Sequence, residues 1–164
     1  LLKASAPSRI VIVASVMHHY ALLNLDKPNP TSYFPAYVYC ASKRADIMWT
    51  RELARRLQGT GVTANCLHPG IVKTDIMRYT PPPFSWGWSL IRALFFISAS
   101  KGARTSVYLA TSDEVEGVSG EYFANCRKAW LAKFTKNPEK ARRLWEICEA
   151  TVRLQDSDPR IGST

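Results

Sequence analysis

The chain has 164 residues, of which 46% are hydrophobic, so it is long enough and apolar enough to form a folded domain rather than a disordered chain. Its formal net charge of +9 would suit a nucleic-acid or membrane-surface partner. The 22 basic residues are nevertheless dispersed in runs of no more than two, without interleaved aromatic residues, which argues against a nucleic-acid interface.

The four cysteines show neither CxxC nor Cys/His metal spacing: Cys40, Cys66, Cys126 and Cys148. Each lies in an apolar helix or strand context, which predicts buried, reduced thiols and no metal site. We therefore expect an intracellular protein, either cytoplasmic or facing an intracellular membrane such as the endoplasmic reticulum.

The first predicted element is a strand over residues 9–14, because a near-continuous β-branched run is typical of a parallel strand covered on both faces. Ser15 follows at its carboxyl end, the edge where open α/β sheets bind ligands, although an isolated serine could equally cap a turn. Residues 16–35 show no clean period and predict a long loop of the kind that covers a site. His18 and His19 within it are more simply hydrogen-bonded loop residues than acid–base groups.

A long helix is predicted over residues 36–58. Tyr39 and Lys43 are four positions apart and share a face, so the ammonium can favour phenolate over phenol and make the tyrosine a usable proton donor or acceptor. Such a pair also arises by chance and is weak evidence alone. The same face continues through a stripe predicted to be buried: Ile47, Thr50, Leu53, Ala54 and Leu57. The opposite side carries three arginines predicted to be solvated: Arg44, Arg51 and Arg55.

A second strand is predicted over residues 62–67, followed by a sharp turn at Pro69 and Gly70 with exposed main-chain groups. Thr74 lies just beyond and, taken alone, is most simply a helix N-cap.

The most apolar part of the chain follows, over residues 81–97. It could line a lipophilic substrate pocket, lie at a membrane interface as a peripheral contact, or pack against the core. Arg92 in its middle argues against a membrane span, and the apolar runs are far shorter than the roughly 18 residues that a span requires.

Three further elements complete the pattern. A helix over residues 101–112 is predicted to turn Ala103, Val107 and either Ala110 or Leu109 inward, and residues 119–124 form a third strand. Asn137 and Pro138 start a helix that runs to about residue 154. Four of its residues are predicted to face inward: Ala141, Leu144, Cys148 and Thr151.

Three motifs together resemble the short-chain dehydrogenase/reductase family: Ser15 after a strand, Tyr39-x-x-x-Lys43 on a helix, and the turn Pro69-Gly70-x-Val72-x-Thr74. Residues 36–43, 51–57 and 141–145, with the long segment between serine and tyrosine, are similar to its retinol-dehydrogenase-like branch. The resemblance covers nearly the whole chain but only the second half of the family's domain. It implies an α/β fold: a partial Rossmann-type, doubly wound parallel sheet with flanking helices, with residues 1–164 as a single partial dinucleotide-binding domain.

The resemblance also implies a function, which is reversible hydride transfer between a nicotinamide cofactor and a small lipophilic alcohol or carbonyl compound such as a retinoid. Ser15 would polarise the substrate oxygen, Tyr39 would exchange its proton, and Lys43 would assist Tyr39 and hold the nicotinamide ribose. The implied cofactor-binding residues are Tyr39, Lys43, Pro69, Gly70, Ile71, Val72 and Thr74. The cofactor is NADP or NAD, with NADP favoured by the resemblance.

The glycines leave two alternatives open. None of the eight forms a G-x-x-x-G-x-G or G-x-G-x-x-G turn that would cradle a pyrophosphate. The chain could therefore be a truncated, catalytically inactive interaction module, or a basic α/β nucleic-acid-binding protein. The first strand is also expected to present an unpaired edge, and the pattern does not determine an oligomeric state.

Overall fold

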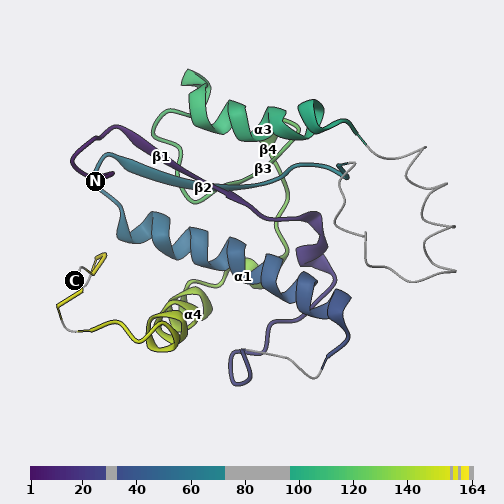
Figure 1. Ribbon diagram of the computed structural model, residues 1–164, viewed down its shortest axis with the longest axis vertical. Coiled ribbons are helices and arrows are strands. Elements are labelled where there is room, and N and C mark those ends of the chain that lie inside the picture. Colours follow the sequence, from purple (N-terminus) through teal and green to yellow (C-terminus); the bar gives the residue numbers. More distant parts are fainter. Residues whose placement is uncertain (29–32, 73–96, 156, 159, 163–164) are drawn as a thin grey trace, which may run out of the picture.

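The computed structural model describes residues 1–28, 33–72, 97–155, 157–158 and 160–162. Its strands are β1 (Ser8–Val13), β2 (Val62–His68), β3 (Tyr122–Ala124) and β4 (Arg127–Lys128). Its helices are η1 (Val16–His19), α1 (Pro35–Arg56), α3 (Ala99–Thr111), η3 (Asp113–Val115), η4 (Lys133–Lys136) and α4 (Pro138–Thr151). In Figure 1, α1 covers one face of the sheet, with α4 packed outside it, and α3 covers the other face.

The sheet has the strand order β1-β2-β3-β4, with the first three strands parallel and β4 antiparallel to β3. This arrangement confirms the predicted α/β fold with a parallel sheet and flanking helices. Among the described residues β1 pairs only with β2, from Ser8 opposite Val62 to Val13 opposite Leu67. As predicted, the first strand has an open edge.

Alternate side chains of β1 belong to the two faces of the sheet. Ile10 and Ile12 pack against clusters that contain residues of α1, whereas Val11 packs with Leu109 of α3. The strand is only half-buried, however, and Val13 is 49% exposed. The prediction of a strand fully covered on both faces was wrong for β1 because it lies at the edge of the sheet.

Helix α1 begins with Pro35 at its first turn. It buries five residues of the predicted stripe: Ile47, Thr50, Leu53, Ala54 and Leu57. Tyr39 was predicted to lie on the same buried stripe but is 39% exposed, because the stripe opens at the first turns of the helix. The prediction that Arg44 is solvated was wrong, since this residue is 3% exposed. Its guanidinium donates to the main-chain oxygens of His18 (2.8 Å) and His19 (3.4 Å). The segment after β1 folds over this side of the helix, which helical spacing alone cannot reveal.

Helix α3 turns a different face to the sheet from the one predicted. Its buried residues are Gly102, Thr105 and Leu109, so Leu109 rather than Ala110 is the inward one of the two predicted alternatives, whereas the predicted inward residues Ala103 and Val107 are exposed. A Cβ placed on Gly102 would lie 2.4 Å from Cγ2 of Val72, so the helix lies close to the chain at this glycine. The absence of a side chain at Gly102 permits this contact, and the apolar residues Ala103 and Val107 lie on the exposed side of α3.

The remaining elements agree with the sequence in part. Asn137 caps α4 by accepting from the Lys140 N–H (2.9 Å), as predicted. Ala141 and Leu144 are buried as expected, while Cys148 is half-buried, Thr151 is exposed, and Trp145 is an unpredicted buried residue. The two-stranded turn into β4 was not predicted, and it bends through Asn125 and Cys126, which have φ values of 52° and 59°.

No helix among the described residues is long and apolar enough to cross a membrane. The predictions for Thr74 and for most of the apolar segment, residues 81–96, lie outside the described residues.

Candidate active site

The first two parallel strands bring two of the predicted motifs to one edge of the sheet. Val13 pairs with Leu67, and the Ala14 N–H donates to the Leu67 carbonyl (2.8 Å). Ser15 and the turn that starts after His68 therefore leave neighbouring strands at the same carboxyl edge.

Ser15 is buried, with 6% of its surface exposed. Its hydroxyl oxygen accepts from the Met17 N–H (3.2 Å) and caps η1. The alternative that this serine caps a turn is therefore confirmed. A hydroxyl has one proton and two lone pairs, and this cap occupies one lone pair. The cap therefore leaves the Ser15 proton available to a substrate oxygen at the edge of the sheet.

Tyr39 and Lys43 lie on successive turns near the start of α1. The Lys43 ammonium is 5.9 Å from the centroid of the Tyr39 ring, and Tyr39 is 39% exposed. The predicted face is thus buried along most of the helix but open at its first turns. A reactive phenol at this place can be reached by a ligand.

Lys43 connects the helix to the strand that carries Ser15. Its ammonium donates to the Val13 carbonyl (3.0 Å) and to the Asp46 carboxylate (2.9 Å). Val13 is two residues from Ser15, so the first bond draws the Tyr39 turn of α1 toward the serine end of β1. Asp46 was not among the predicted site residues, although an acid three residues after a helical lysine is a recognisable signal for such a pair.

The structure describes the predicted cofactor turn as far as Val72. Gly70 has φ 89°, a left-handed conformation that glycine adopts without steric cost. The Ile71 carbonyl accepts from the Ile97 N–H (2.9 Å), and Val72 forms a parallel bridge with Ile97. Ile71 is 51% exposed, so this turn is accessible beside the strand end.

Two histidines, the buried His18 and the half-buried His68, lie near this edge. Burial lowers the pKa of His68, and it lowers the pKa of His18 to about 4, against the raising effect of a hydrogen bond to the Ser15 carbonyl. Both rings are therefore neutral near pH 7. His18 is a hydrogen-bonded residue of the loop, as predicted, but neither its contact with Ser15 nor the support of Arg44 could be seen from spacing.

All four cysteines are free thiols, and Cys40 and Cys66 are buried as predicted, while Cys126 and Cys148 are half-buried. Burial raises the pKa of the Cys66 thiol to about 12, which makes it a poor nucleophile. In the described part of the chain, no group of three or more His, Cys, Asp or Glu side chains is arranged to hold a metal ion.

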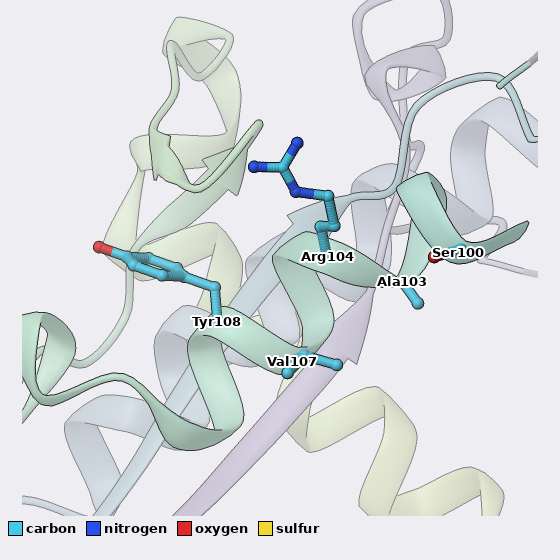
Figure 2. A pocket seen from close by; sticks show the side chains of 5 residues that line it. All are labelled: Ser100, Ala103, Arg104, Val107 and Tyr108. Atoms are coloured by element: carbon cyan, nitrogen blue, oxygen red, sulfur yellow. The ribbon is translucent and has the colours of Figure 1, made fainter. Parts of the chain in front are cut away.

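A surface hollow of about 460 Å³ lies away from these residues, on the outer side of α3. It is lined by Ser100, Ala103, Arg104, Val107 and Tyr108, which all come from this one helix (Figure 2). None of the predicted site residues lines it, so its size does not make it the reaction site.

Comparison with known proteins adds independent information about the chain. The family model for short chain dehydrogenase matches residues 2–83. The chain belongs to the short-chain dehydrogenase family. Its relatives include human retinol dehydrogenase 14, which is 48% identical over 157 residues, covering 94% of this chain and 47% of the relative. Human retinol dehydrogenase 12 is 40% identical over 150 residues, covering 90% and 47% of the two chains.

The predicted retinol-dehydrogenase-like resemblance is thereby confirmed. The chain spans about half the length of these relatives. A crystal structure of an uncharacterized protein from Mycobacterium paratuberculosis shares the fold, with a TM-score of 0.67 at 24% identity, covering 90% of this chain and 51% of that one.

Short-chain dehydrogenases use a nicotinamide cofactor, and the described residues fit its nicotinamide end. The turn at Gly70 offers main-chain groups at the strand edge, and a Cβ there would lie 2.7 Å from Cδ1 of Ile97, so only glycine fits without displacing that side chain. The ammonium of Lys43 has three N–H donors, and its two bonds leave one for a ribose hydroxyl. The sequence holds no glycine-rich turn for the pyrophosphate.

Proposed function

We propose that this chain carries the catalytic residues of an NAD(P)-dependent oxidoreductase that interconverts a lipophilic alcohol and its aldehyde or ketone. The observation that carries the proposal is the hydrogen bond from Lys43 to the Val13 carbonyl, because it joins the helix of Tyr39 to the strand end before Ser15. The relatives named retinol dehydrogenases support a retinol-like substrate.

In the alcohol-oxidising direction, the Ser15 hydroxyl donates a hydrogen bond to the substrate oxygen and orients it. The Tyr39 phenolate takes the proton of the substrate hydroxyl, and the positive charge of Lys43 stabilises the phenolate before that transfer. An oxidised nicotinamide, when bound, would supply the acceptor for the hydride of the carbinol carbon. In the reverse direction Tyr39 returns the proton.

The nicotinamide end of the cofactor would be held by the turn after β2: Pro69, Gly70, Ile71, Val72 and Thr74. Lys43 would hold the ribose hydroxyls, and Tyr39 would lie beside the ring. NADP(H) is proposed over NAD(H) on the basis of the resemblance to the retinol-dehydrogenase-like branch.

Residues 1–164 are further proposed to form the second half of a dinucleotide-binding domain. Two observations support this division: β1 has a strand on one side only among the described residues, and no glycine-rich turn occurs in the sequence. A first half that contains this turn would pair with the open edge of β1. The relatives are about twice as long as the segment that they share with this chain, which leaves room for such a half.

The test is a chimera in which this chain replaces the matched 157-residue segment of human retinol dehydrogenase 14. NADPH-dependent reduction of retinal is measured for the chimera, for Tyr39→Phe and for Tyr20→Phe. Tyr39→Phe is expected to lower kcat by at least about 100-fold, the usual contribution of a general acid. Tyr20, which is 72% exposed, provides the matched control and should leave kcat unchanged.

Loss of turnover in Tyr39→Phe alone would support the proposal, whereas an inactive chimera or an active Tyr39→Phe variant would contradict it. The second candidate, an inactive interaction module, is favoured by the absence of a glycine-rich turn. An inactive chimera that is folded and dimerises or binds another protein would support that candidate. If the chain alone bound NADPH at micromolar concentration, the proposal that it is only the second half of a dinucleotide-binding domain would be wrong.

A further inference from the structure

The turn that follows β1 is held at the main-chain oxygen of Ser15. This oxygen accepts from the His18 main-chain N–H at 3.2 Å and from the His18 ring Nδ1 at 2.7 Å. A carbonyl oxygen can only accept, so Nδ1 must carry the proton. The shorter of the two bonds is therefore made by the imidazole side chain.

The surroundings of His18 keep its ring in place and neutral. The side chain is fully buried, and its edge meets the Tyr122 ring at a centroid distance of 5.1 Å. The ring of His19 lies 3.8 Å away, and the Arg44 guanidinium binds the His18 carbonyl. His68 is the other titratable neighbour, and its influence, like that of Arg44 and His19, disfavours an added positive charge.

The second nitrogen of the ring shows which of the two ring nitrogens of His18 acts on the turn. Nε2 of His18 has no hydrogen-bond partner among the described residues. With Nδ1 bonded and Nε2 without a partner, the specific contribution of the ring is its contact with Ser15. An asparagine amide at this position could reproduce the Nδ1 donor but not Nε2.

We infer that His18 is a positioning residue, whose Nδ1–H fixes the Ser15 turn and thereby aims the Ser15 hydroxyl. This inference rests on the catalytic role proposed above for Ser15. The hydroxyl oxygen is held from one side by the Met17 N–H, and the carbonyl of the same residue is held by His18. The far end of the turn is anchored by Arg44, through the carbonyls of His18 and His19.

Nuclear magnetic resonance of the chain labelled with ¹⁵N-histidine tests the tautomer directly. His18 is expected to show a protonated Nδ1 and an unprotonated Nε2, without change between pH 8 and about pH 5. An Nε2–H tautomer, or titration near the ordinary histidine value of about 6.5, would overturn the inference because the ring would then not be held as described.

Amide hydrogen exchange in two variants tests the effect on the turn. In His18→Leu, the Met17 amide is expected to exchange at least about fivefold faster, as for the loss of one hydrogen bond, and His18→Asn should restore it to within about twofold. The Cys66 amide, which donates to the Glu121 carbonyl within the sheet, reports global opening. Equal acceleration at Cys66 would show a merely structural role and contradict the inference.

Activity of the retinol dehydrogenase 14 chimera separates this inference from the proposed function. His18→Leu should lower kcat about tenfold with little change in KM, and His18→Asn should recover most of that loss. If Ser15→Ala abolishes turnover while His18→Leu leaves kcat unchanged, the positioning role is wrong and the proposed function stands. If Ser15→Ala leaves turnover unchanged, the proposed role of Ser15 itself is wrong.

Discussion

Helices α1 and α3 cover opposite faces of the same strands, but they are attached in different ways. Helix α1 is bound by charged side chains to the end of β1 and to the segment after it, since Lys43 donates to the Val13 carbonyl and Arg44 to the His18 carbonyl. Helix α3 lies close to the chain at Gly102 and buries Leu109 in an apolar cluster, and its C-terminal end accepts hydrogen bonds from Arg9 of β1 at the carbonyls of Leu109 (3.3 Å) and Ser112 (2.7 Å). Hydrogen bonds to carbonyls are directional, whereas apolar packing mainly sets the distance between layers. The directional bonds of α1 lie beside the proposed reactive groups, whereas those of α3 lie at its C-terminal end.

The largest effect is expected from removing the buried cation on the α1 side. In Arg44→Met the His18 carbonyl, which is buried, loses its side-chain donor. The free energy of unfolding should therefore fall by about 3 kcal/mol. Arg104→Met is the control because Arg104 is exposed on α3, and it should change this free energy by less than about 0.5 kcal/mol. Urea unfolding followed by circular dichroism measures both, and equal losses would contradict the distinction between the helices.

The next effect tests the close approach of α3. Gly102→Val places side-chain atoms where a Cβ already lies 2.4 Å from Val72, and overpacking of this kind should cost about 2 kcal/mol. Ala103→Val introduces the same residue one position along, on the exposed side of the helix. Thermal unfolding should separate the two variants by several degrees. A similar melting temperature for both would show that Gly102 is not confined.

A pH-dependent effect comes from the α1 side. The pKa of His18 is about 4 in the folded chain and near 6.5 when unfolded, so the unfolded chain binds more protons between these values. Stability contributed by the neutral ring is therefore present above about pH 6.5 and falls as the pH falls toward 4. The loss from pH 7 to pH 5 should be on the order of 2 kcal/mol.

In His18→Asn this part of the pH dependence should disappear. A smaller slope of the same sign should remain, because the pKa values of His19 and His68 are also lowered by burial. Urea unfolding at pH 5, 6 and 7 provides the comparison. Parallel curves for the original chain and the variant would show that His18 is protonated as readily in the folded state as in the unfolded one.

The smallest effect is expected on the outer face of α3. Val107 is 57% exposed, so Val107→Ser should change the free energy of unfolding by less than about 0.5 kcal/mol. Val11→Ser, on the side of β1 that packs with Leu109, is the buried-side comparison and should cost more. A loss above 1 kcal/mol in Val107→Ser would mean that this face is covered in solution.

The sequence predicted the site elements well and their surroundings less well. Tyr39 and Lys43 could be placed together because helical spacing is local, and the strand before Ser15 was visible in its β-branched run. The Asp46 and Val13 contacts of Lys43 depend on side-chain conformation and on the neighbouring strand. The contact between His18 and Ser15 depends on the turn geometry, for which neither residue type is a specific signal.

By itself, the sequence determined the order of strands and helices, the family, and which side chains share a helical face. Those properties follow from periodicity and from short motifs, which depend on residues near one another in the chain. Only the tertiary structure decided which face each neighbour covers. Arg44 is buried because the segment after β1 folds over it, and Val107 is exposed because α3 turns Gly102, Thr105 and Leu109 inward instead. Burial depends on what packs against a surface, and in this fold the packing partners come from distant parts of the chain.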